Sequence, residues 1–154
     1  MSSDKLNKVK IDKYRFVVQK HNSSRKHFDL RLEFKGMLKS WAVPQGIALN
    51  INEKRLAIET KDHPMEFLDY EDNSNGHNGE NKKMEIWDKG TYAPIKIKPS
   101  ESNEEVLESG FKRGKVSLSL EGEKLNGEYA LVKTSFKSND HWLIIKKQEK
   151  DEKK

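Results

Sequence analysis

The amino-acid sequence predicts a mainly β protein, an antiparallel barrel or sandwich with one or two short helices. Short stretches rich in β-branched and aromatic residues recur along the chain, bounded by Gly, Asn or Pro. One of them, HFDLRLEF at 27–34, alternates apolar and polar residues without exception. This regular spacing of short strands favours an antiparallel architecture over an α/β fold.

The expected elements follow in chain order. The first strand is YRFVVQK at 14–20, and the alternating segment at 27–34 is the second. Further strands are expected at 38–44, 55–60, 84–92, 115–120, 127–134 and 141–147. One helical pattern stands out, SNEEVLESG, with Ser102 or Asn103 as its N-cap and Gly110 as its C-cap.

The length of 154 residues predicts one domain. We expect it at 11–147, between a disordered N-terminal tail at 1–10 and a charged C-terminal tail at 148–154. The segment 71–83 has Asn, Gly and charge but nothing to bury, so a flexible loop is expected there. Neither terminal stretch has the apolar region of a signal peptide or a membrane span, which favours a soluble, cytoplasmic protein.

Composition restricts the chemistry. The chain has no cysteine, which excludes disulfides, thiolate catalysis and Cys-ligated zinc, so a metal site must use His, Asp, Glu or Asn. The formal net charge of +5 is a weak indication of a polyanionic partner, because lysine-rich surfaces also serve solubility. Three tryptophans, Trp41, Trp87 and Trp142, lie in strand patterns and are expected to pack in the core rather than stack on bases.

The strand at 27–34 carries a cluster of chemically active residues on its polar face, which we expect to be exposed. His27, Asp29 and Arg31 lie in one row, and His21 ends the preceding strand. If the two strands pair, His21 completes a set of two imidazoles and one carboxylate. Such a set suits Mn²⁺, Fe²⁺ or Zn²⁺ and leaves positions open for water and substrate. Arg31, farther along, is suited to gripping an anion because its planar fork matches phosphate oxygens.

The other histidines allow several interpretations. His63 precedes Pro64 after a strand, where a turn can aim the ring toward the row, although a His before Pro is more often only a turn residue. His77 and His141 are expected at the surface. The plainest alternative for the cluster itself is a solvated polar face with two surface histidines.

A different enzyme class also fits part of the pattern. His27 and Asp29 with His63 or His141 as the third ligand would form the facial triad of a non-heme Fe(II) oxygenase. That interpretation leaves His21 without a role.

Several segments, in this order, resemble a known family: FVVQKHNSSRKHFDLRLEFKGMLKSWAVPQG, RLAIETKDHP, WDKGTY, KLNGEYALVKT and HWLIIKK. Over 14–147 the chain resembles the 3′-phosphoesterase domain associated with bacterial ligase D of nonhomologous end joining. The resemblance implies a small antiparallel β-barrel that uses Mn²⁺, with Co²⁺ or Zn²⁺ as further candidates. It implies an enzyme that removes a terminal ribonucleoside from a DNA or primer 3′ end and then removes the phosphate left behind.

The resemblance also implies residue roles. It matches three residues to metal ligands, namely His21, His27 and Asp29. It matches three residues to the surroundings of the phosphate, namely Arg31, Arg55 and His63, and it links Gln19 to activity. In this mechanism the two arginines offset the charge that develops and His63 assists the leaving oxygen.

The chain departs from the family pattern at several positions. Gln45 stands where the family usually has Lys, Phe67 stands where it has Tyr, and the loop 71–83 replaces a segment of Gly-Tyr-Gly character. The charged residues of the family's N-terminal arm have no clear counterpart before Lys10. The Gln45 amide would take the place of a cation beside the phosphate. Loss of that cation should slow hydrolysis of a doubly charged terminal monoester more than hydrolysis of a singly charged diester, so 3′-phosphate ends should accumulate.

The expected partner is a DNA or primer–template 3′ end with a terminal ribonucleotide or a 3′-phosphate. We expect a monomer that works as a stand-alone version of the domain beside a separate ligase, polymerase and end-binding protein. A non-enzymatic alternative is a barrel that binds nucleic-acid ends without cleaving them, with Gln45 and Phe67 marking lost catalysis. The intact His21, His27 and Asp29 set argues against it, because pure binding does not need an open metal site.

Overall fold

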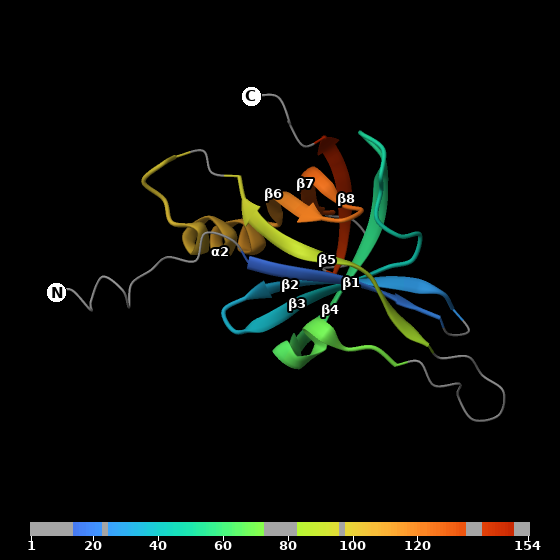
Figure 1. Cartoon of the computed structure of the whole chain (residues 1–154). Coiled ribbons are helices and arrows are strands. Elements are labelled where there is room, and N and C mark those ends of the chain that lie inside the picture. Colours follow the sequence, from blue (N-terminus) through green and yellow to red (C-terminus); the bar gives the residue numbers. More distant parts are fainter. Residues whose placement is uncertain (1–13, 23–24, 73–82, 96–97, 135–139, 150–154) are drawn as a thin grey trace.

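The computed structural model describes residues 14–22, 25–72, 83–95, 98–134 and 140–149. Within these ranges, eight strands close into an antiparallel barrel, in the order β1-β2-β3-β4-β8-β7-β6-β5 (Figure 1). The elements are β1 (Tyr14–His21), β2 (His27–Phe34), β3 (Met37–Val43), β4 (Lys54–Pro64), η1 (Met65–Asp69), β5 (Met84–Pro94), α2 (Asn103–Arg113), β6 (Lys115–Gly122), β7 (Asn126–Lys133) and β8 (His141–Gln148). The predicted fold class is confirmed, and the barrel rather than the sandwich is the form adopted.

The strand limits differ most from the prediction at β4. That strand continues to Pro64, four residues past the predicted end, and the short 3-10 helix η1 follows it directly. The expected tail at 1–10 and residues 73–82 of the expected loop lie outside the described residues. The extension of β4 carries His63, one of the residues that the sequence singles out.

The predicted N-cap of the helix is confirmed and its predicted C-cap is wrong. The Ser102 side chain accepts a hydrogen bond from the backbone of Glu105, whose carboxylate accepts one from the backbone of Ser102. The helix runs past Gly110 and ends at Gly114, which has the left-handed φ of 81°. Gly110 is instead buried in the helix, where an added Cβ would lie 2.8 Å from the Val116 Cβ. A glycine there therefore permits close packing of α2 on β6.

The apolar side chains of the alternating strands fill the barrel. Phe28, Leu30 and Leu32 of β2 point inward with Trp41 and Trp142, as the alternation predicts. Helix α2 covers the end of the barrel where β5 ends and β6 begins, and its Leu107 is fully buried in the core. In the described part of the chain, no helix is long and apolar enough to cross a membrane.

The opposite end of the barrel, which we call the mouth, is where β1 ends and β2 begins. The segment 44–53 covers this end, and two hydrogen bonds hold the segment in place. Tyr129 donates its hydroxyl to the Ala48 carbonyl at 2.9 Å, and the buried Lys146 ammonium donates to the Leu49 carbonyl at 3.3 Å. Trp87, at this end, is only partly buried, unlike the core position that the sequence predicts.

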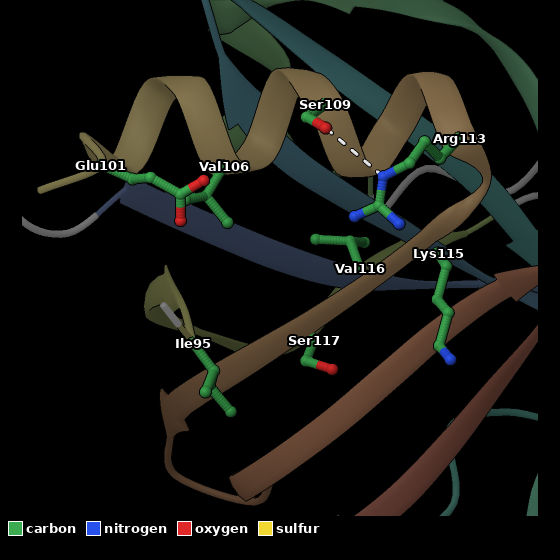
Figure 2. Close-up of a pocket in the computed structure, with 8 residues that line it drawn as sticks. All are labelled: Ile95, Glu101, Val106, Ser109, Arg113, Lys115, Val116 and Ser117. Carbon is green, nitrogen blue, oxygen red and sulfur yellow. Dashed lines mark hydrogen bonds between the residues drawn. The ribbon is translucent and has the colours of Figure 1, made fainter. Parts of the chain in front are cut away.

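A pocket of about 280 Å³ lies between α2 and β6 (Figure 2). Val106 and Val116 provide apolar surface, and the Arg113 guanidinium donates to the Ser109 hydroxyl at 3.3 Å beside them. This pocket lies at the α2 end, whereas His21 and His27 lie at the mouth. It is therefore separate from the residues that the sequence singles out.

A buried carboxylate holds the turn between β6 and β7 at the mouth. Asp88 of β5 accepts four backbone hydrogen bonds at 2.8 to 3.0 Å, from Lys89, Glu123, Lys124 and Leu125. Both of its oxygens are used, and the side chain is removed from water. Such charge-assisted bonds are stronger than neutral ones, so Asp88 connects two parts of the chain 35 residues apart.

We predict that Asp88→Ala lowers the free energy of unfolding by roughly 3 kcal/mol, because four backbone donors lose a buried acceptor. Urea denaturation monitored by tryptophan fluorescence measures the change. The matched control is Asp69→Ala, which removes an exposed carboxylate paired with Lys89 and should leave the midpoint unchanged. Equal denaturation midpoints for the two variants would contradict the role of Asp88 in holding the β6–β7 turn.

Candidate metal and phosphate site

The predicted row of polar residues lies on the outer face of the barrel. Strand register places His21 opposite His27 and Gln19 opposite Asp29, while the next outward residue of β2 is Arg31. The residues between them on β2 belong to the interior, so the two faces are separated as the alternation predicts. Hairpin pairing of β1 and β2 therefore brings the sequence-predicted residues together at the mouth end of one face.

His21, His27 and Asp29 form a compact set of potential ligands. Their ligand atoms all lie within 4.8 Å of one another. The Asp29 carboxylate lies between the two rings, with Oδ1 at 3.3 Å from His27 Nε2 and Oδ2 at 3.7 Å from His21 Nδ1. The ring centroids are 4.8 Å apart in an edge-on arrangement.

The residues fit a divalent transition metal. His27 Nδ1 lies 3.0 Å from the backbone carbonyl of Arg25, which only accepts, so Nδ1 carries a proton and Nε2 is the nitrogen that faces Asp29. This outer hydrogen bond is the one that metal-binding histidines commonly make. Burial, with a smaller contribution from His27, lowers the pKa of His21 and favours the neutral imidazole that binds metals. Two imidazoles and one carboxylate suit Mn²⁺, Fe²⁺ or Zn²⁺.

Arg31 is buried at the centre of a hydrogen-bonded cluster, which we call the hub, whereas the sequence predicts it on an exposed face. Its side chain is only 4% exposed. The guanidinium donates from Nε to Gln19 Oε1 at 2.7 Å and from Nη1 to the Ser40 hydroxyl at 3.0 Å, while Nη2 lies 3.6 Å from Asp29 Oδ2. Arg31 thus joins three neighbouring strands. It places a positive charge directly behind His21, His27 and Asp29, which we call the metal set.

The predicted exposure of this face is wrong, because η1 folds back across it. Leu68 of η1 packs on Val17 and Leu38, which form a second apolar cluster on the outside of the barrel. Gln19 is fully buried beneath η1 and donates its amide to the backbone carbonyls of Phe67 and Tyr70 at 2.7 and 3.0 Å. η1 and Gln19 together therefore shield this side of Arg31 from water.

His63 reaches this hub through a β-bulge. The β3–β4 register shifts between Leu38 and Ser40, so β4 contains one extra residue and His63 pairs with the outward-facing Leu38. Its Nδ1 lies 3.1 Å from Arg31 Nη1, and since a guanidinium only donates, Nδ1 accepts and the ring proton lies on Nε2. Burial first, and then the Arg31 charge, lower the pKa of His63. The ring is therefore held neutral in one tautomer.

Arg55 and Gln45 lie apart from this hub. The Arg55 guanidinium donates to the backbone carbonyls of Gln45 and Gly46 at 2.6 and 3.0 Å, and it lies 3.4 Å from a Glu53 oxygen. Arg55 pairs with Ile144, a core residue, so its side chain belongs to the interior side of the mouth. The structure therefore does not bring Arg55 or Gln45 together with Arg31 and His63.

The histidine set of the oxygenase interpretation is not assembled. His141 begins β8 at the α2 end, where it lies 3.1 Å from an Asp140 oxygen. The histidine that joins His27 and Asp29 is His21. His77 lies outside the described residues.

Two further residues shape the site: Ser40, which the sequence did not indicate, and Phe67, which it marked only as a departure from the family pattern. Ser40 lies opposite Arg31 and accepts its hydrogen bond. The alternation of side chains along β3 was the available signal, because it places Ser40 on the same outer face as Arg31. The Phe67 ring lies 5.4 Å from the Arg31 guanidinium carbon and 5.0 Å from the His63 ring centroid. The sequence had marked Phe67 only as a departure, and its contact with Arg31 depends on the path of η1.

Fold and site together define a class: a small closed β-barrel domain with a candidate metal site beside a buried arginine on its outer face. Residues 19–133 match the family described as the DNA Ligase D 3′-phosphoesterase domain, and the chain belongs to this family. This membership confirms the resemblance seen in the sequence.

Three relatives show the extent of the similarity. The chain is 40% identical over 134 residues to the multifunctional non-homologous end joining protein LigD of Pseudomonas aeruginosa, covering 86% of the chain and 15% of that protein. It is 38% identical over 140 residues to the LigD DNA repair protein of Mycobacterium tuberculosis, covering 90% and 17%. It is 39% identical over 130 residues to LigD of Mycolicibacterium smegmatis, covering 84% and 16%. The chain therefore spans less than a fifth of the length of each of these relatives.

We predict that His27→Ala weakens Mn²⁺ or Co²⁺ binding by at least tenfold, because the set loses one of its imidazoles. Isothermal titration with the metal alone measures this without any substrate. His141→Ala is the matched control, since that imidazole lies at the other end of the barrel, and it should bind as the wild type does. Unchanged affinity in His27→Ala would refute the metal site.

We predict that Arg31→Lys lowers the free energy of unfolding by roughly 2 to 4 kcal/mol, since an ammonium cannot reach Gln19, Ser40 and His63 together. The matched control is Arg15→Lys, at an exposed arginine paired with Glu33, where a loss below about 1 kcal/mol is expected. Urea denaturation measures both variants. A loss for Arg31→Lys that is no larger than for Arg15→Lys would rule out the hub.

Proposed function

We propose that this chain is a metal-dependent phosphoesterase that processes the 3′ ends of DNA or primer strands in DNA end repair. It would remove a terminal ribonucleoside as a phosphodiesterase and then the remaining phosphate as a 3′-phosphomonoesterase. The observation that carries the proposal is the His21, His27 and Asp29 set beside the buried Arg31, in a member of the 3′-phosphoesterase domain family. The relatives' names, which state non-homologous end joining, supply the biological setting.

The three-residue set would hold one divalent ion, with Mn²⁺ as the favoured metal and Co²⁺ or Zn²⁺ as alternatives. When bound, such an ion polarises a phosphoryl oxygen and activates water. The lowered pKa of His21 favours the neutral imidazole, which would accept the ion without first losing a proton.

The chain's own residues would contribute positive charge and hydrogen bonds. Arg31 would offset negative charge on the phosphoryl group, and because Gln19 and Ser40 hold it in advance, it needs little reorganisation. Gln19 is thus a positioning residue, since it is fully buried and acts through Arg31. His63 carries its proton on Nε2 and would donate a hydrogen bond from there to the leaving oxygen.

Arg55 and Gln45 would act away from the reacting phosphate. Both lie at the mouth, where they would contact the strand beyond the scissile bond. We propose that the protein is a cytoplasmic monomer and that it acts on the same DNA ends as a ligase, a polymerase and an end-binding protein.

We predict that, with Mn²⁺, the protein shortens a primer that ends in one ribonucleotide and that a strand with a 3′-phosphate appears before the 3′-hydroxyl product. Gel mobility before and after treatment with a 3′-phosphatase distinguishes the two products. His27→Ala and excess chelator should each abolish shortening, whereas His141→Ala should retain it. Shortening that persists in excess chelator, or a primer that stays intact with Mn²⁺, would contradict the proposal.

A further inference from the structure

A second pocket, of about 270 Å³, lies at the mouth of the barrel. It is formed by the start of β2, the segment 44–53, the start of β4 and the start of β5, and all of its residues are described. They are Phe28, Gln45, Gly46, Ile47, Leu49, Asn50, Glu53, Arg55 and Trp87. None of them belongs to the His21, His27 and Asp29 set.

The pocket combines aromatic surface with side-chain amides. Phe28 and Trp87 meet edge to face with ring centroids 5.5 Å apart, and Leu49 adds an apolar side chain that is 46% exposed. Gln45 and Asn50 each bring an amide that can both donate and accept hydrogen bonds. A planar heterocycle with polar edges, such as a nucleobase, matches this combination.

A β-bulge places Trp87 in this pocket. The β1–β5 register runs from Val18 opposite Asp88 to Gln19 opposite Ile86, which leaves Trp87 as the extra residue of β5. The Lys124 ammonium lies 5.2 Å from the centre of the Trp87 ring. This ammonium also donates to the Trp87 backbone carbonyl at 2.8 Å, and its positive charge beside the pocket adds attraction for a chain of phosphates.

The pocket is close to the metal set but on the other face of the sheet. His27 and Phe28 are consecutive in β2, so the first points outward to Asp29 and the second inward to the mouth. Consecutive strand residues are separated by about 3.3 Å along the chain. A nucleic-acid strand that crosses the rim of the barrel here can place a phosphate at the metal set and an adjoining base in the pocket.

We propose that the mouth pocket binds the base of a nucleotide next to the reacting phosphate. The proposal rests on the proposed function, because it assumes that the reacting phosphate lies at the metal set. The base enters unstacked, so the pocket selects single-stranded or frayed 3′ ends over paired ones. Stacking on Trp87 and Leu49 tolerates every base, which suits an enzyme that must accept any end sequence.

The test measures binding of the wild-type protein in excess chelator, where no cleavage competes. Fluorescence anisotropy is recorded with labelled oligonucleotides that end in one ribonucleotide. One oligonucleotide is intact, one lacks the terminal base, one lacks the preceding base, and one lacks a base eight nucleotides upstream. We expect affinity about tenfold lower for either the terminal or the preceding abasic strand, and no loss for the distant one. Equal affinity for all four strands overturns the proposal.

A matched pair of variants assigns the effect to the pocket. Leu49 and Ile51 belong to the same segment and are each 46% exposed, but only Leu49 lines the pocket. Leu49→Ala and Trp87→Leu should reduce the difference between intact and abasic strands severalfold, while Ile51→Ala should preserve it. An equal effect of Leu49→Ala and Ile51→Ala overturns the assignment.

The outcome separates this inference from the proposed function. Metal-dependent shortening of the primer with no dependence on either neighbouring base overturns the pocket alone. Absence of both shortening and binding overturns the two together. Base-dependent binding with normal shortening supports both.

Discussion

The buried Arg31 guanidinium is the interaction on which the rest of the outer face depends. A cation removed from water is costly unless its donors are used, and those of Arg31 are used by residues from three other strands. Gln19 comes from β1, Ser40 from β3 and His63 from β4. Because these hydrogen bonds must form together, they align β1, β2, β3 and β4 and hold the positive charge of Arg31 behind Asp29.

The same requirement explains why η1 crosses the face of the sheet. The Gln19 amide has two ends, and while its oxygen accepts from Arg31, its nitrogen donates to two carbonyls at the end of η1. Leu68 adds an apolar contact with Val17 and Leu38 outside the barrel. Cover over Arg31 strengthens its electrostatic interactions, because the local dielectric constant falls when water is excluded. The metal set, at the open end of the row, stays accessible: side-chain exposure is 31% at His21 and 24% at His27.

Two β-bulges, one in β4 and one in β5, place side chains on faces that regular alternation would not give them. The shift in β4 turns His63 toward Arg31 on the outer face, and the extra residue in β5 leaves Trp87 at the interior side of the mouth. A strand without either bulge would carry these side chains on the opposite face, because side chains alternate with a period of two. The metal set and the mouth pocket thus lie on the two faces of one hairpin end.

Local sequence patterns predicted the strands, the two faces of β2 and the residues of the candidate metal set. These follow from local patterns, since alternation over eight residues defines which side chains share a face and a short hairpin brings His21 to His27. Only the tertiary structure decided that Arg31 is buried, that Arg55 belongs to the mouth and that His63 reaches the hub. Those facts depend on bulges, on barrel closure and on a covering segment more than thirty residues away in the chain, and no local periodicity records such long-range contacts.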